Sequence, residues 1–295
     1  MTLPRLLPLL LLVLLQACSS LPGPDQAGQF PIARSREVPD KVDRALVLIP
    51  GAFASVDIFR PAVEWHLPRT EVVAYRFPGM DQLPLDHQVE IRGSARLIAD
   101  YVNALNVQHV DIIGYSTGGP IAIETVERLN APDIRVALVS SATSFPGPLL
   151  STLRGTLDFW RASLRSHFAG QNATLTENYR TLLYGEDHYS DPTRAEESEA
   201  LADKQRATMI RPSLKETMAQ TASLLRWRLE PDPDLHGARI RLFHGSDDPV
   251  FPLPEARKFA SRLHADGIRV YEGQGHLLYV TSGSLFDDIR DFFGR

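Results

Sequence analysis

The sequence is poor in cysteine, in basic charge and in metal-binding motifs, and each shortage excludes a class of protein. Cys18 is the only cysteine among 295 residues, so the chain forms no intramolecular disulfide and no cysteine-based metal site. The formal net charge of -5 gives no basic excess that would attract nucleic acid, so no nucleic-acid partner is expected. The nine histidines do not follow a zinc spacing such as H-E-x-x-H, and no metal is expected.

One long apolar run stands at the amino terminus. Residues 6–15 are leucine apart from one proline and one valine, and Arg5 precedes them. As a helix this run spans about 15 Å, half of the roughly 30 Å of hydrocarbon in a bilayer. It therefore indicates a signal peptide over residues 1–17 and not a membrane-spanning helix.

The residues that follow this run place the only cysteine at a potential lipidation site. Leu15-Gln16-Ala17-Cys18 resembles the bacterial lipobox, in which the cysteine is lipidated and becomes the mature amino terminus. Ser19 in the next position is similar to lipoproteins of the outer membrane. The resemblance implies an envelope protein anchored at Cys18 by acyl chains such as palmitate, with residues 18–44 as a tether. The alternative is an ordinary signal peptide whose cleavage site adjoins a cysteine.

From residue 45 onward, apolar strand patterns alternate with amphipathic helix patterns, as in an α/β fold. The alternation predicts a mostly parallel sheet of about six strands with helices on both faces. One weak strand around residues 30–36 could be added at most. The block 144–236 has helical patterns but no strong strand, which predicts a helical cap inserted into a core of residues 45–143 and 237–295. Strands are expected at 45–50, 71–77, 110–113, 136–139, 240–243 and 268–271, and helices at 91–105, 119–129, 149–168, 214–227, 255–263 and 285–293.

The sequence Gly114-Tyr115-Ser116-Thr117-Gly118 is a G-x-S-x-G motif between a strand pattern and a helix pattern. This setting presents a serine on a tight, strained turn, where glycines permit close approach of the backbone. Pro120 suits the first turn of the following helix. Ser116 is therefore the candidate nucleophile. The other reading is an ordinary glycine-rich turn between strand and helix.

With this motif, residues 45–295 resemble the α/β-hydrolase superfamily, whose triad follows the order serine, acid, histidine. The segment His244-Gly245-Ser246-Asp247-Asp248 is similar to the family's G-x-x-D loop, and its spacing selects Asp248 over the adjacent Asp247. Gly273-Gln274-Gly275-His276 is similar to the family's G-x-G-H. The other eight histidines are interpreted as surface or packing residues. The resemblance implies a catalytic triad of Ser116, Asp248 and His276.

The resemblance also implies two backbone donors for an oxyanion. One is the N–H of Thr117, directly after the serine. The other comes from the loop after the first strand, where the family commonly has His-Gly and this chain has Pro50-Gly51. This difference removes a side chain but no backbone donor, so the N–H of Ala52 is the second expected donor. Such donors contribute about 3 kcal/mol each to transition-state stabilisation.

A serine triad predicts acyl transfer to water without a cofactor, and a carboxylic ester, small or lipid, is the expected substrate. A peptidase, amidase or thioesterase would use the same triad, because the cap decides the substrate. Epoxide and haloalkane hydrolysis in this fold normally need an acidic nucleophile, which argues against both. The last alternative is a non-catalytic envelope lipoprotein that uses the fold for binding. Its sequence would show a broken triad, whereas here the motifs are intact.

Overall fold

The structure is a computed structural model that describes residues 21–34, 41–148, 171–186, 190–205 and 211–294. The predicted signal peptide, Cys18, Ser19 and the predicted helix at 149–168 lie outside the described residues. Among the helices within those ranges, none is long and apolar enough to cross a membrane.

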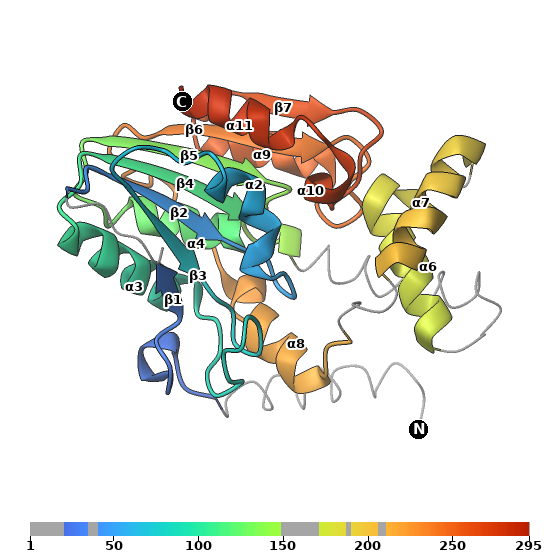
Figure 1. The fold of residues 1–295 in the computed structure, drawn as a ribbon, viewed down its shortest axis with the longest axis horizontal. Coiled ribbons are helices and arrows are strands. Elements are labelled where there is room, and N and C mark those ends of the chain that lie inside the picture. Colours follow the sequence, from blue (N-terminus) through green and yellow to red (C-terminus); the bar gives the residue numbers. More distant parts are fainter. Residues whose placement is uncertain (1–20, 35–40, 149–170, 187–189, 206–210, 295) are drawn as a thin grey trace.

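A seven-stranded sheet forms the centre of the fold, in the order β1-β3-β2-β4-β5-β6-β7 (Figure 1). All neighbouring strands are parallel except β1, which is antiparallel to β3. The six predicted strands are confirmed, and the weak strand expected around residues 30–36 is the edge strand β1. The strands are β1 (Ile32–Arg34), β2 (Arg44–Ile49), β3 (Thr70–Tyr75), β4 (His109–Tyr115), β5 (Asp133–Val139), β6 (Arg239–Gly245) and β7 (Ile268–Tyr271).

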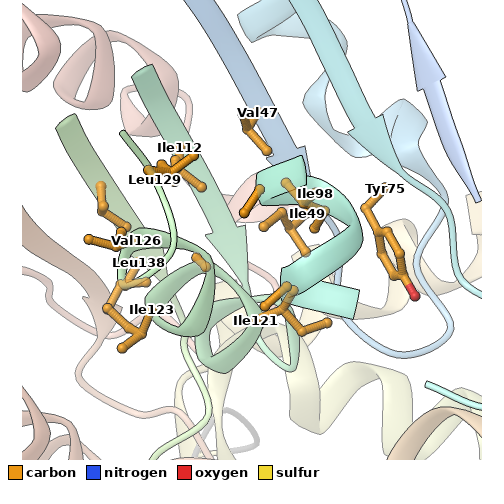
Figure 2. Close-up of a cluster of buried hydrophobic side chains, with 14 of the residues drawn as sticks. Val47, Ile49, Tyr75, Ile98, Ile112, Ile121, Ile123, Val126, Leu129 and Leu138 are labelled. Atoms are coloured by element: carbon orange, nitrogen blue, oxygen red, sulfur yellow. The ribbon is translucent and has the colours of Figure 1, made fainter. Parts of the chain in front are cut away.

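Strand β2 shows why its sequence is a continuous apolar run. Ala45, Val47 and Ile49 belong to one hydrophobic layer, whereas Leu46 and Leu48 belong to the layer on the opposite face. Side chains alternate between the faces of a strand, and helices cover both faces here, so all five positions from Ala45 to Ile49 are apolar. The first layer (Figure 2) joins the sheet to α3 (Ile91–Ala104), α4 (Gly118–Val126) and α9 (Leu253–Arg262), and the second joins it to α2 (Arg60–Val63), α10 (Leu278–Thr281) and α11 (Leu285–Phe293).

The chain before β2 packs on the domain. The carbonyl of Pro22 accepts a hydrogen bond from the N–H of Gln88 at 2.9 Å, and the N–H of Gly28 donates to Asp86 Oδ2 at 3.0 Å. Further along, β1 adds to the edge of the sheet beside β3. The segment predicted as a tether therefore already contains a strand of the domain. A strand of three residues is too short to leave a clear alternation in the sequence.

Between β5 and β6, the described residues form helices and no strand, as predicted for the cap. Helices α6 (Gln171–Tyr184) and α7 (Pro192–Gln205) pack against each other at one end of the molecule (Figure 1). Helix α8 (Leu214–Thr221) lies apart from them and begins with a reciprocal capping box between Ser213 and Glu216. The boundaries predicted for the cap remain predictions.

Candidate active site

Ser116 lies on a sharp turn between β4 and α4, with a positive φ of 51°. Its N–H donates to the carbonyl of Val139 and its carbonyl accepts from the N–H of Ala142, both at 3.0 Å. A Cβ on Gly118 would lie 2.2 Å from the carbonyl oxygen of Ile49, so only glycine fits at that position. The neighbouring segments thus hold the serine in a backbone conformation that non-glycine residues rarely adopt.

His276 reaches the serine from the loop that follows β7. Its Nε2 lies 3.1 Å from Ser116 Oγ, and its Nδ1 lies 2.8 Å from Asp248 Oδ2. An ionised carboxylate only accepts hydrogen bonds, so Nδ1 carries the proton in the neutral ring. Nε2 is then the lone-pair atom that faces the serine hydroxyl, which is the arrangement of a general base and its nucleophile.

Asp248 is buried, and hydrogen bonds occupy both of its carboxylate oxygens. Oδ2 accepts from His276, and Oδ1 accepts the N–H groups of Val250 at 2.8 Å and Phe251 at 2.9 Å. Burial by itself raises the pKa of Asp248, but the charge and hydrogen bond of His276 outweigh it, and the pKa lies below its usual value. The carboxylate therefore stays ionised and fixes the imidazole.

The adjacent Asp247 faces away from the histidine. Its side chain is 45% exposed, and Oδ2 lies 3.6 Å from the guanidinium of Arg194 on α7. The structure therefore brings Asp248 to His276, which is the residue that the spacing from Gly245 selects.

A second histidine lies behind the acid. His244 of β6 is fully buried, its Nε2 lies 2.6 Å from the carbonyl oxygen of Phe251, and the same atom lies 3.6 Å from Asp248 Oδ2. Its Nδ1 has no hydrogen-bond partner among the described residues. Burial lowers the pKa of His244 below its usual value, although the charge of Asp248 opposes this effect. His244, interpreted from the sequence as a surface or packing residue, thus also contacts the loop that carries the acid.

We expect His244 to make the stability of the fold depend on pH. An imidazole with a lower pKa in the folded chain stays neutral there, so the unfolded chain takes up a proton first as the pH falls. The free energy of unfolding should therefore decrease below about pH 6.5, by at most about 1.4 kcal/mol per pH unit from this group. Urea denaturation between about pH 7.5 and 5.5 measures this slope, with His244→Gln as the matched control. Glutamine keeps a donor without ionising, so its slope should be smaller, and equal slopes would contradict the role of His244.

Aromatic side chains surround the imidazole of His276. The ring centroid of Tyr115 lies 5.4 Å from that of the imidazole, and the ring centroid of Phe251 lies 5.8 Å from it. Tyr279 packs edge-on against Tyr115, with their ring centroids 5.2 Å apart. Burial raises the pKa of Tyr115 and Tyr279 well above the usual value, and raises that of Tyr179 to about 12. These phenols therefore remain protonated at neutral pH.

The last turn of the cap helix α6 holds the backbone of the histidine loop. The N–H of Gly275 donates to the carbonyl of Leu183, and the N–H of His276 donates to that of Leu182, both at 2.8 Å. A Cβ on Gly275 would lie 2.5 Å from the carbonyl oxygen of Leu182. The cap is therefore part of the frame of the site as well as a cover for the core.

The two predicted oxyanion donors lie on the turns at the serine. Thr117 follows Ser116 directly, and Gly51, which precedes Ala52, is so close that a Cβ on it would lie 2.7 Å from Ser116 Cβ. Within the described ranges, no protein acceptor takes the N–H of Ala52 or of Thr117. That these two groups bind a substrate oxygen stays a prediction.

Residues 46–287 match the alpha/beta hydrolase family. The chain belongs to this family. The order of its strands, the strained serine turn and the histidine loop after the last strand of this alpha/beta hydrolase agree with that assignment.

Solved structures of the same fold include three proteins with named activities. A carboxylesterase from the thaumarchaeon Nitrososphaera gargenis is 18% identical, with a TM-score of 0.63 over 89% of this chain and 92% of its own. A thermophilic esterase from Thermogutta terrifontis is 16% identical, with a TM-score of 0.62 over 91% and 96%. The enol-lactonase from Burkholderia xenovorans is 14% identical, with a TM-score of 0.63 over 90% and 96%. At these identities the likeness shows that this hydrolase shares their fold.

Proposed function

We propose that this alpha/beta hydrolase is a serine hydrolase that cleaves carboxylic esters through an acyl-enzyme intermediate. The observation that carries the proposal is the hydrogen-bonded chain from Ser116 Oγ through His276 to Asp248. A serine hydroxyl is a weak nucleophile at neutral pH, and this chain supplies the base that activates it.

In the first half of the reaction, His276 Nε2 takes the hydroxyl proton while Ser116 Oγ bonds to the ester carbonyl carbon. The carbonyl oxygen becomes an oxyanion, which the N–H groups of Ala52 and Thr117 stabilise by about 3 kcal/mol each. The bond from this carbon to the alcohol oxygen then breaks, and His276 returns its proton to that oxygen. The alcohol leaves, and the acyl group stays on Ser116.

In the second half, water replaces the alcohol. His276 takes a proton from the water as its oxygen attacks the acyl carbon, and the same two N–H groups stabilise the second oxyanion. The bond to Ser116 Oγ breaks, the proton returns to the serine and the carboxylic acid leaves. Asp248, which is buried and ionised, stabilises the imidazolium in both halves.

Three of the similar structures support an ester as the substrate. They carry the names carboxylesterase, esterase and enol-lactonase. Their names apply to this chain only through the shared fold, so the substrate needs a direct test.

A panel of p-nitrophenyl esters of increasing acyl length provides this test. The purified protein should release p-nitrophenol, and the acyl length with the highest kcat/KM measures the size of the acyl pocket. The p-nitroanilides and thioesters of the same acyl groups form the matched comparison, since they share the pocket but change the leaving atom. Faster cleavage of the anilides or thioesters than of the esters would overturn the ester assignment.

We also propose that the protein is held in the bacterial cell envelope, at the outer membrane, through lipidated Cys18. The support is the lipobox-like sequence Leu15–Cys18 followed by Ser19. Two or three acyl chains hold a protein on a membrane durably, whereas one chain binds only marginally.

Replacing Cys18 by alanine is expected to release the protein from the membrane fraction. The wild type, expressed in a bacterium with labelled palmitate, should carry the label and partition into the detergent phase. In membrane fractionation it should appear in the fraction that contains outer-membrane markers. The Cys18→Ala variant should carry no label and appear in the aqueous phase. A wild type without label, or a labelled variant, would contradict lipidation at Cys18.

A further inference from the structure

The side chain of Gln220 is buried on the cap helix α8 and uses both ends of its amide. It is 2% exposed. Its Oε1 accepts the N–H of Phe53 at 2.7 Å, and its Nε2 donates to the carbonyl of Pro78 at 2.8 Å. A backbone N–H can only donate and a carbonyl can only accept, so the amide satisfies both groups in one orientation alone. Gln220 therefore joins the loop after β2 to the loop after β3.

The group that Gln220 holds belongs to the turn that carries the proposed oxyanion donor. The N–H of Ala54 bonds to the carbonyl of Gly51 at 3.3 Å, which makes Gly51–Ala54 a four-residue turn with Ala52 and Phe53 at its centre. Phe53 has a positive φ of 62°, which is the conformation of the third residue in a type II turn. Glycine is favoured at that position, and a phenylalanine there needs support from its surroundings.

A type II turn can convert into a related conformation, the type I turn, in which the third residue has negative φ. The two types differ by a rotation of about 180° of the central peptide, here the one between Ala52 and Phe53. The N–H of Phe53 belongs to that peptide. Gln220 Oε1 binds it in the type II orientation, and a rotated peptide would lose this acceptor. The hydrogen bond from Phe53 to Gln220 thus opposes relaxation of the turn beside Ser116.

Helix α8 is itself fixed to the core, so Gln220 has a firm base. The N–H of Val89 donates to the carbonyl of Ala219 at 2.7 Å, and the N–H of Ile91 donates to Ser223 Oγ at 3.1 Å. These contacts tie the end of the helix to the segment that begins α3. The position of the amide is therefore set by the fold and does not depend on a substrate.

We propose that Gln220 is a positioning residue that holds the Gly51–Ala54 turn so that the N–H of Ala52 meets the oxyanion. The inference rests on the proposed function, because it assigns a role within that reaction. Gln220 acts through the turn and touches no reacting atom. Its loss weakens binding of the transition state and leaves binding of the ester nearly unchanged.

The first test replaces Gln220 by methionine, which has similar length and no amide. With a p-nitrophenyl ester, kcat should fall about 10- to 100-fold while KM changes less than about threefold. Affinity for an alkylboronic acid, which forms a tetrahedral adduct with the serine, should fall by the same factor as kcat/KM. Lys215→Met, at an exposed position of the same helix, should behave like the wild type. Thermal unfolding of both variants shows whether the fold persists.

The second test replaces Gln220 by glutamate and separates positioning from packing. An ionised carboxylate would face the carbonyl of Pro78 without a proton to donate, whereas a protonated one accepts and donates as the glutamine does. Glu216, which lies four residues before Gln220 on α8, adds a like charge that disfavours the ionised form further. The ratio of kcat for Gln220→Glu to that of the wild type should therefore rise at least about threefold from pH 8 to pH 6. The wild type measured at each pH is the control for every other group that titrates.

The outcomes distinguish this inference from the function on which it rests. An inactive wild type would overturn the proposed ester hydrolysis and the positioning role together. An active wild type would leave the function standing, and a folded Gln220→Met variant with unchanged kcat would then overturn the positioning role alone. A rise in KM with unchanged kcat for Gln220→Met would also overturn it. So would a ratio of kcat for Gln220→Glu to kcat for the wild type that does not change with pH.

Discussion

Replacing Ser116 by alanine is expected to lower kcat for ester hydrolysis by about 10⁵- to 10⁶-fold. The alanine variant keeps the buried site and both backbone donors but has no oxygen to form an acyl-enzyme. KM should change little, because the hydroxyl binds the ester only when the bond forms. Steady-state hydrolysis of the preferred p-nitrophenyl ester measures the loss.

Ser141→Ala is the matched control for this prediction, since Ser141 is a buried serine beside α4 that does not contact His276. Its kcat should stay within about tenfold of the wild type, a loss that repacking alone can cause. Equal activity of Ser116→Ala and the wild type would remove the serine from the mechanism.

The second large effect is expected at the acid. Asp248→Asn should lower kcat by about 10⁴-fold, because asparagine offers a donor as well as an acceptor and no longer fixes Nδ1–H of His276. Asp247→Asn changes the adjacent residue in the same way but affects an ion pair with Arg194 and a hydrogen bond from Ser246, both outside the contacts of His276, so its kcat should stay within about threefold. The pair of variants compares two neighbouring carboxylates with one substitution. Reversed effects would assign the acid to Asp247.

The framework of the fold could be predicted from local patterns. Strand β2 is apolar at every position after Arg44 because helices cover both faces of the sheet, and such a run is visible in a window of six residues. Ser116 could be predicted because the strained turn requires glycine at fixed spacings, and His276 was implied by the resemblance of its loop to the family's G-x-G-H. Asp248 followed from its spacing to Gly245, and the structure brings these three residues together.

The supports of the site could not be predicted from the sequence. Gln220 lies 167 residues from Phe53, and no local pattern marks a helix residue whose amide will bind a distant turn. The carbonyls of Leu182 and Leu183 hold the histidine loop through backbone atoms, which leave no trace in residue type. The contact between His244 and Asp248 could not be predicted either, because it depends on the path of the loop that follows β6.

Leu182, Leu183 and Gln220 lie on helices between β5 and β6, whereas His244 belongs to β6 itself. Helix α6 holds the loop of His276 and helix α8 holds the turn of Ala52, whereas the turn of Ser116 is held by the core strand β5. The proposed nucleophile is thus fixed by the sheet, and the proposed base and one proposed oxyanion donor are fixed by the segment between β5 and β6. Sequence changes in the cap should therefore affect kcat as well as substrate choice.

The central claim is that Ser116, activated by His276, forms a covalent acyl-enzyme. Labelling with an alkyl fluorophosphonate followed by peptide mass spectrometry tests it most directly, because the reagent bonds only to an activated serine and stays attached. We predict one label per chain on the peptide that contains Ser116, no label in Ser116→Ala, and labelling slowed by at least about 10³-fold in His276→Gln. A folded protein that hydrolyses esters while Ser116 stays unlabelled, or that carries the label on another serine, would contradict the account.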